Sequence, residues 1–210
     1  MRVDLAAEVF AGTDGLADLL AMLRRVASGQ HDWVADQAVL RAAEPYLRAN
    51  IPALADVYLD LARKGTVAGQ AWATATQASD IIRIEPATLR PMASDLCRPA
   101  VLVVENQQAD GCFVRAVATV LGFAKVTRAI SPETGWLEIC HGGGSDLVQV
   151  ATAAAGRFHL LTRVVALLDS DRLVPHGPAP GDRKRQRLDA VGKILVHVLA
   201  LREAENYVPN

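Results

Sequence analysis

Apolar positions in the first 97 residues recur with the spacing of amphipathic helices. Thr13-Asp14 can cap a helix that ends at Gly29 and whose apolar stripe has a period near 3.6 residues. The stripe consists of Leu16, Leu19, Leu20, Leu23 and Val26. Further helical patterns cover His31 to Asn50, Ile51 to Lys64 and Val67 to Ile82, with Gly65 as a helix-terminating residue. Residues 1–97 are therefore predicted to form an α-helical docking or dimerisation module.

After Pro99 the pattern changes to an alternation of strands and helices. The predicted strands are Ala100–Val104, Trp136–Cys140, Val164–Leu168 and Leu195–Leu199, and the predicted helices are Ala109–Leu121 and Asp146–Ala155. The first strand is apolar throughout, as expected for a strand that is covered on both faces of a parallel sheet. This alternation predicts a doubly wound α/β domain with a mainly parallel sheet over residues 98–210. In such domains, functional sites gather at the carboxyl ends of the strands.

The segment Arg172–Lys193 interrupts this alternation with a polar, Pro-rich and basic stretch, which we interpret as an insert. It holds the one dense basic run of the sequence, namely Arg183, Lys184, Arg185 and Arg187. Two interpretations remain open for this run. It is either a solvated, flexible loop or a surface that contacts a phosphate backbone.

Composition narrows the function classes only a little. Lys and Arg total 22 against 23 Asp and Glu, so overall charge favours neither nucleic acid nor a membrane as a partner. Three cysteines are too few for a disulfide framework and are expected to be reduced. The amino terminus lacks a signal-peptide pattern, and the most apolar stretch, Phe158–Leu168, is too short and too interrupted to span a bilayer. The sequence therefore predicts a cytoplasmic protein without a membrane partner.

Two carboxylates, Asp169 and Asp171, follow the predicted strand Val164–Leu168. Side chains along a strand alternate between faces, so an Asp-x-Asp pair that continues the strand turns both carboxylates the same way. Two such charges repel each other unless a cation lies between them, and Mg²⁺ prefers oxygen ligands of this kind. The pair therefore predicts half of a metal site. The alternative is a pair of solvated loop aspartates.

Two other predicted strands also end in polar groups. Glu105 follows Ala100–Val104, and a loop with His141, Gly142, Gly143 and Gly144 follows the next strand. The glycines can offer backbone N–H groups to a phosphate or simply permit a tight turn. His141 either donates to a phosphate or makes an ordinary hydrogen bond in the loop.

These motifs, in their order, resemble a known catalytic fold. They are Val103-Val104-Glu105, the glycine loop, Leu168-Asp169-Ser170-Asp171 and Arg202-Glu203-Ala204-Glu205-Asn206-Tyr207. The set resembles the topoisomerase–primase (Toprim) fold. The last motif is similar to the Arg-Glu-x-Glu-Asn-Tyr signature of Toprim nucleases of the overcoming-lysogenization-defect class and related phage-defence proteins. The resemblance covers the chain from about Ala100 to its end.

The resemblance implies a metal-dependent nuclease that uses Mg²⁺ or Mn²⁺, cleaves nucleic acid with DNA favoured, and acts in antiviral defence. Asp169 and Asp171 would hold metal, and Glu105 would bind metal or act as a general base. Glu205 matches the acidic residue of the last motif and would complete a second metal site, cap a helix or pair with Arg202. The chain departs from the family after Glu105, because the family often has Gly next and an Asp four residues beyond the glutamate. Here Asn106 follows, and Asp110 lies one place further on.

Two other functions remain open. The chain could be a non-catalytic Toprim-like interaction subunit of a larger defence complex, or a phosphotransferase in which the first aspartate is the nucleophile. The sequence contains no P-loop, so any ATPase partner would lie on another chain. A second copy of this chain is the other protein partner that the sequence leaves open.

Overall fold

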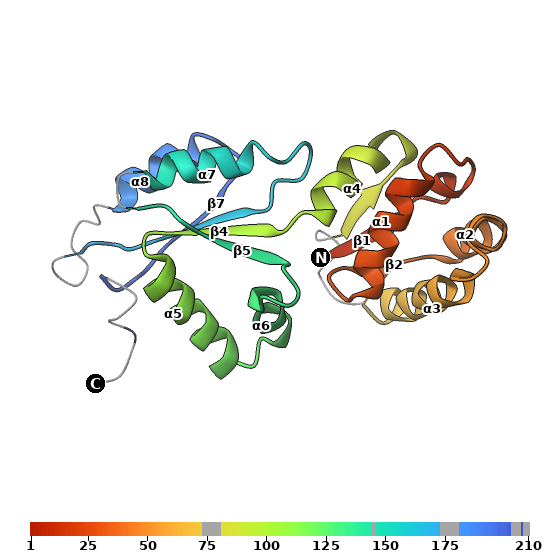
Figure 1. Ribbon diagram of the computed structural model, residues 1–210, viewed down its shortest axis with the longest axis horizontal. Coiled ribbons are helices and arrows are strands. Elements are labelled where there is room, and N and C mark those ends of the chain that lie inside the picture. Colours follow the sequence, from red (N-terminus) through yellow and green to blue (C-terminus); the bar gives the residue numbers. More distant parts are fainter. Residues whose placement is uncertain (73–80, 144–145, 173–180, 203–206, 208–210) are drawn as a thin grey trace. The chain divides into compact units, whose positions relative to one another are not determined.

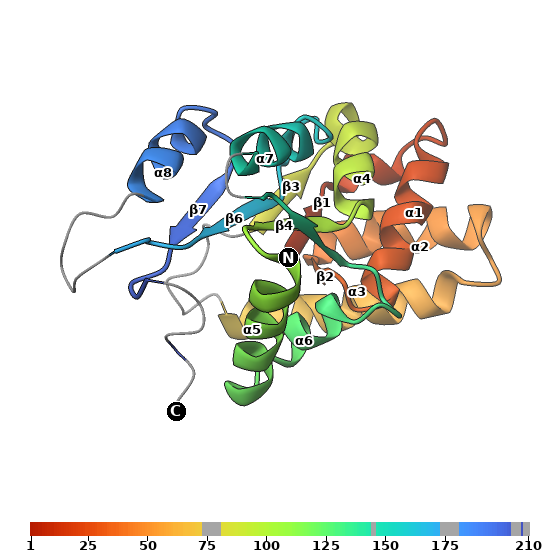
Figure 2. The ribbon, with the colours of Figure 1, turned by 60° about the vertical axis from the view of Figure 1, so that its left-hand side comes forward.

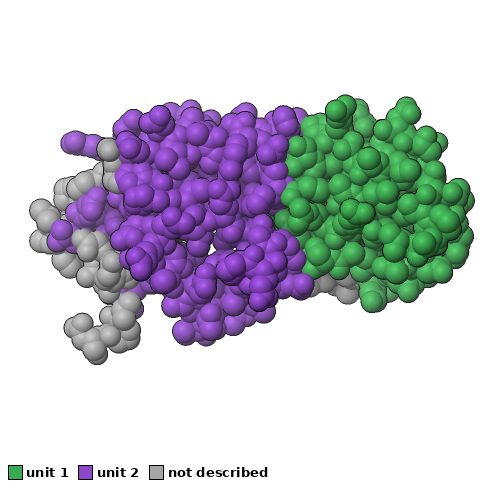
Figure 3. Space-filling view, viewed as in Figure 1, with its two compact units in different colours: residues 1–97 green, residues 98–210 purple. Residues whose placement is uncertain are grey.

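The computed structural model describes residues 1–72, 81–143, 146–172, 181–202 and 207, and it describes side chains in these ranges except at 68–72. Thin grey traces mark the other residues in Figures 1 and 2. The chain divides into two compact units, Met1–Cys97 and Arg98–Asn210 (Figure 3), and this boundary coincides with the one that the sequence indicated. Each unit contains its own parallel sheet.

Unit 1 (Met1–Cys97) is built on a three-stranded parallel sheet with the order β2-β1-β3. Its strands are β1 (Arg2–Leu5), β2 (Asp32–Val34) and β3 (Ile81–Ile84). Its helices are η1 (Ala7–Phe10), α1 (Leu16–Ala27), α2 (Gln37–Asn50), α3 (Ala55–Trp72), η3 (Pro86–Thr88) and α4 (Leu89–Cys97). The prediction of a purely α-helical module over residues 1–97 is therefore wrong, because unit 1 is itself α/β.

The strands of unit 1 were missed because they are very short. In β1 only Val3 and Leu5 are buried, so the period of two repeats just twice. The predicted helix from His31 to Asn50 begins with β2 instead, and α2 starts only at Gln37. Asp36 sets that start, because its Oδ1 accepts a hydrogen bond from the Val39 N–H at 2.8 Å.

Gly65 does not end a helix, contrary to the prediction, since α3 continues through it to Trp72. A Cβ at this position would collide with the backbone carbonyl of Trp33 on β2. The glycine therefore permits a close approach between the helix and the strand.

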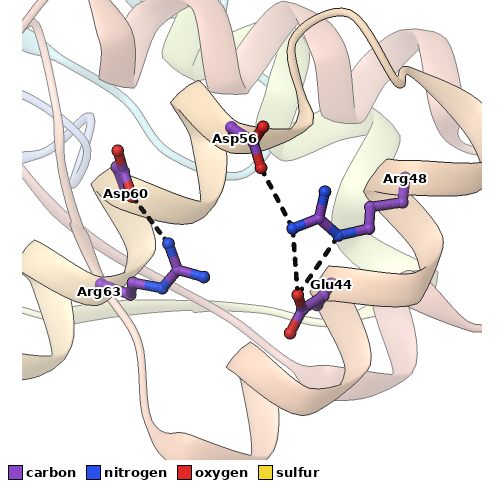
Figure 4. Close-up of polar contacts among 5 residues, drawn as sticks. All are labelled: Glu44, Arg48, Asp56, Asp60 and Arg63. Carbon is purple, nitrogen blue, oxygen red and sulfur yellow. Dashed lines mark hydrogen bonds and ion pairs between the residues drawn. The ribbon is translucent and has the colours of Figure 1, made fainter.

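The exposed sides of α2 and α3 carry a small group of ion pairs (Figure 4). Arg48 lies 3.3 Å from Glu44 on its own helix and 3.2 Å from Asp56 on α3, and Arg63 lies 2.8 Å from Asp60. All five side chains are largely exposed to water, where an ion pair contributes about 0–1 kcal/mol. The stability of unit 1 therefore depends mainly on its buried apolar residues.

Unit 2 (Arg98–Asn210) contains a four-stranded parallel sheet with the order β5-β4-β6-β7. Its strands are β4 (Ala100–Val104), β5 (Leu137–His141), β6 (Val164–Leu168) and β7 (Leu195–Val198). Its helices are α5 (Gln107–Val120), α6 (Ala124–Ile130), α7 (Leu147–Ala155) and α8 (Gly181–Asp189). Helices α7 and α8 cover one face of the sheet, and α5 and α6 lie on the other (Figures 1 and 2). The predicted parallel α/β architecture of this half is confirmed.

The core between the sheet and α7 also includes α8. Val103 and Ala166 of the sheet are buried in one cluster with Leu147 of α7 and Leu188 of α8. Residues 181–189 are therefore a packed helix, and the flexible-loop interpretation, one of the two left open by the sequence, is wrong for them. Leu188 is the one large apolar residue of α8, so no apolar stripe marks this helix in the sequence. The preceding residues 173–180 lie outside the described ranges.

Candidate functional site

The candidate site lies at the carboxyl edge of the unit 2 sheet. Strand β4 is hydrogen-bonded to β5 on one side and to β6 on the other, and all three run in the same direction. Glu105 immediately follows β4, and Asp169 immediately follows β6. The strand order β5-β4-β6-β7 thus places these two carboxylates after neighbouring strands at one edge.

Glu105 forms an ion pair with Lys184 of α8. The Lys184 Nζ lies 2.9 Å from both Glu105 Oε1 and Glu105 Oε2. The Glu105 side chain is only 16% exposed and the Lys184 side chain only 25% exposed. Water therefore screens this pair less than it screens the surface pairs of unit 1. Lys184 was expected to contact a substrate phosphate, but its ammonium is directed at the sheet edge.

Helix geometry separates Lys184 from its basic neighbours. Lys184 lies four residues before the fully buried Leu188, and residues at this spacing share one face of a helix. Arg183, Arg185 and Arg187 are exposed, and Arg185 Nε lies 3.5 Å from Asp189 Oδ2. The basic run is therefore an exposed group of three arginines together with one inward-directed lysine.

The loop after β6 is tied to the segment that follows β7. Ser170 is fully buried, and its Oγ donates a hydrogen bond to the Leu201 carbonyl at 2.8 Å. The backbone N–H groups of Ser170 and Asp171 both donate to the Arg202 carbonyl, at 3.1 and 3.3 Å. These bonds join the Asp-x-Asp motif to the start of the last motif through the backbone.

Asp171 does not continue the strand. Strand β6 ends at Leu168, and Asp171 has a φ of 52°, in the left-handed region that non-glycine residues rarely adopt. The argument that strand alternation turns Asp169 and Asp171 to the same face is therefore wrong for this pair.

The last motif is described only at its two ends. Tyr207 accepts a hydrogen bond from the Leu201 N–H at 2.9 Å, and its ring lies 5.6 Å from the Phe113 ring of α5. Glu205 and Glu203 fall outside the described residues, so the three interpretations of Glu205, as part of a second metal site, as a helix cap or as a partner of Arg202, stay predictions.

Asp110, the residue that departs from the family spacing, has a structural role. Its Oδ2 accepts a hydrogen bond from the Asn106 N–H at 2.8 Å, and the side chain is buried. Asn106 in turn caps α5, because its Oδ1 accepts from the N–H groups of Gln108 and Ala109. These two residues fix the turn that directly follows Glu105.

The glycine loop forms a tight turn. The Gly142 N–H donates to the Val104 carbonyl at 2.7 Å, so this group is already used within the sheet. A Cβ at Gly142 would crowd Leu147, and Gly143 has a φ of 46°. The turn interpretation therefore accounts for both glycines, while Gly144 lies outside the described residues. His141 is the exposed last residue of β5.

Glu138 and Cys140 form a second polar group on β5, which none of the sequence motifs includes. Glu138 accepts hydrogen bonds from Arg157 at 3.0 Å and from the Cys140 thiol at 3.3 Å. Burial, followed by the hydrogen bond to Glu138 and its charge, raises the pKa of Cys140 to about 11. Burial alone would raise the pKa of Glu138, but the bonds from Cys140 and Arg157 lower it overall. The Cys140 thiol is thus protonated at neutral pH and is a poor nucleophile.

A small pocket of about 270 Å³ lies between α5, α6 and β5, and its lining includes Gln107, Arg115 and Ile139. It is smaller than the roughly 300–1,000 Å³ of most small-molecule sites. The Gln107 side chain also already donates to the Ile139 carbonyl at 2.9 Å. The pocket is therefore a weaker candidate than the carboxyl edge.

The donor set at this edge fits a hard cation in chemistry, since Glu105 and Asp169 offer carboxylate oxygens after neighbouring strands. The Lys184 ammonium shows that Glu105 is placed to accept a positive charge. Within the described ranges, however, no three His, Cys, Asp or Glu side chains are grouped closely enough to hold one metal ion. In this arrangement the Lys184 ammonium donates hydrogen bonds to both carboxylate oxygens of Glu105.

No protein-family model, curated protein or solved structure matches the chain. None of the described helices is long and apolar enough to cross a membrane.

Proposed function

We propose that unit 2 is the catalytic domain of a Toprim-type nuclease that cleaves phosphodiester bonds of nucleic acid with Mg²⁺ or Mn²⁺. The observation that carries this proposal is the position of Glu105 and Asp169 directly after the neighbouring parallel strands β4 and β6. The order of the motifs supports it, and the resemblance favours DNA as the substrate and antiviral defence as the role. An ATPase on another chain or a second copy of this chain would be its protein partners.

The proposed roles follow from the chemistry of the side chains. Asp169 and Asp171 would hold the cation, and Glu105 would bind it or accept a proton from water. A bound cation supplies stabilisation of the negative charge that gathers on the phosphodiester during cleavage. The exposed arginines Arg183 and Arg187 would contact backbone phosphates.

A cleavage assay tests the proposal directly. Supercoiled plasmid and labelled oligonucleotides are incubated with the protein and Mg²⁺ or Mn²⁺, with and without EDTA. We expect cleavage that EDTA abolishes and that Asp169→Asn abolishes while the fold is retained. Asp189→Asn is the matched control, because it removes the same charge from an exposed position on α8. Equal cleavage by wild type and Asp169→Asn would refute the assigned site.

A second candidate is a non-catalytic Toprim-like interaction subunit. The observation that favours it is the engagement of both Glu105 oxygens by Lys184, together with the lack of a three-residue metal group among the described side chains. This candidate predicts that DNA binding, if present, is unaffected by EDTA and that no cleavage occurs with either cation.

A further inference from the structure

Lys184 meets Glu105 in the way that a single bound cation would. Its Nζ is equidistant from both carboxylate oxygens, at 2.9 Å from each. Both side chains are largely withdrawn from water, and the two residues are 79 positions apart in the sequence. The pair is therefore a product of the tertiary fold.

The start of α8 is fixed against the Asp169–Asp171 loop. A Cβ at Gly181 would collide with the Asp169 carbonyl, so only glycine allows this approach. The Gly181 N–H also makes a long hydrogen bond of 3.5 Å to the Ser170 carbonyl. Three residues later, the same helix presents Lys184 to Glu105. One rigid element therefore contacts both parts of the candidate site.

The buried end of α8 fixes Lys184 further. Leu188 is fully buried in the core between the sheet and α7, on the same face of the helix as Lys184. The ammonium can leave Glu105 by rotation of its own side chain, while the backbone of the helix stays packed. The helix thus holds Lys184 next to Glu105, while another cation can take the place of the ammonium at the carboxylate.

We propose that Lys184 is a built-in counter-cation of Glu105 that competes with the divalent cation for this carboxylate. The inference rests on the proposed function, since it takes Glu105 as a ligand. Without a divalent cation, the ammonium balances a largely buried negative charge that would otherwise be costly. A divalent cation reaches both Glu105 oxygens only when it displaces the ammonium. Lys184 is thereby a positioning residue that weakens metal binding and keeps the site ordered without metal.

Calorimetric titration of the full chain with Mn²⁺ tests this competition. Lys184→Met should tighten Mn²⁺ binding by about tenfold, equivalent to about 1.4 kcal/mol, because the competing charge is gone. Lys184→Arg should return the affinity towards that of wild type, since a guanidinium can also pair with the carboxylate. Arg183→Met is the control, because it removes one positive charge from the adjacent, exposed position of α8 and should change the affinity much less.

Thermal unfolding in EDTA supplies a second readout. Lys184→Met should lower the melting temperature in EDTA, and added Mn²⁺ should raise it by more than it raises that of wild type. The double variant Glu105→Gln/Lys184→Met, which removes both charges, should recover part of the loss. If Lys184→Met is poorly folded, Lys184→Gln replaces it in both measurements.

The outcomes separate the inference from the proposed function. Equal or weaker Mn²⁺ binding by the Lys184→Met and Lys184→Gln variants, with metal-dependent cleavage by wild type, would overturn the inference alone. An absence of both Mn²⁺ binding and cleavage in wild type and in every variant would overturn both proposals. Tighter binding by Lys184→Met that Arg183→Met does not reproduce would support the inference.

Discussion

The charge on Glu105 is the residue-scale feature on which the candidate site depends. A carboxylate with 16% of its side chain exposed needs a positive partner, and Lys184 supplies it. Glu138 on β5 also has a cationic partner, Arg157, but both of these side chains are more than 40% exposed. The two glutamates therefore have similar partners in different surroundings, which makes Glu138 a useful control for Glu105.

Cys140 should react much more slowly than Cys112 with iodoacetamide. Its pKa of about 11 leaves only about one thiol in a thousand ionised at pH 8, and the thiolate is the reactive form. Cys112 is exposed. Mass spectrometry of peptides from the folded protein measures both rates. Glu138→Gln should speed the reaction at Cys140, because it removes the nearby negative charge. Equal rates at the two cysteines in wild type would show that the pKa of Cys140 is not raised by burial and Glu138.

At the scale of elements, the sequence predicted those strands that consist of a long run of apolar residues. Strand β4 was predicted to the residue and the apolar part of β6 was also recognised, because each is a continuous run of five apolar residues in the interior of a parallel sheet. The prediction that the second of these strands continues into the Asp-x-Asp pair was wrong, since β6 ends at Leu168. Helix α8 was missed because Leu188 is its one large apolar residue. The ion pair of Lys184 with Glu105 could not be predicted from the apolar pattern of the strands or of the helices, since it depends on how α8 packs on the sheet. The signal available was the spacing of Lys184 four residues before Leu188.

Gly181→Ala should destabilise unit 2 through the docking of α8. The added Cβ would collide with the Asp169 carbonyl, and overpacking of this kind typically costs about 1–3 kcal/mol. Gly156→Ala is the control, because its Cβ would meet only ordinary contacts and its backbone φ is −64°. Urea unfolding monitored by circular dichroism measures both variants. A loss of stability no greater for Gly181→Ala than for Gly156→Ala would show that α8 does not pack against the loop in this way.

The exposed arginines of α8 should contribute to DNA binding through salt-dependent contacts. Replacing both Arg183 and Arg187 with Gln should weaken binding and reduce the log–log salt slope by about 0.7–0.9 for each lost phosphate contact. The effect should be similar for all sequences, because phosphate contacts carry no base information. Fluorescence anisotropy in EDTA at several salt concentrations measures the slope. An unchanged slope would assign substrate binding to another surface.

At the scale of the whole molecule, the sequence correctly separated two halves but misjudged the first. Unit 1 has its own three-stranded parallel sheet, whose strands of three or four residues were too short to interrupt the helical pattern. Unit 2 has the predicted parallel sheet and the strand ends on which the site depends. The formal net charge of −1 provides no general attraction for nucleic acid, so the proposed binding would depend on local groups such as the arginines of α8.

Glu105 is proposed to belong to a metal-dependent phosphodiesterase site. The most direct measurement compares plasmid cleavage by Glu105→Gln and Glu138→Gln in Mg²⁺ or Mn²⁺, after circular dichroism has established that both variants are folded. Each variant removes one carboxylate charge that has a cationic partner, but only Glu105 follows β4 at the carboxyl edge. We expect Glu138→Gln to cleave at a rate close to that of wild type and Glu105→Gln to lose cleavage. Cleavage by Glu105→Gln at the wild-type rate would contradict the account.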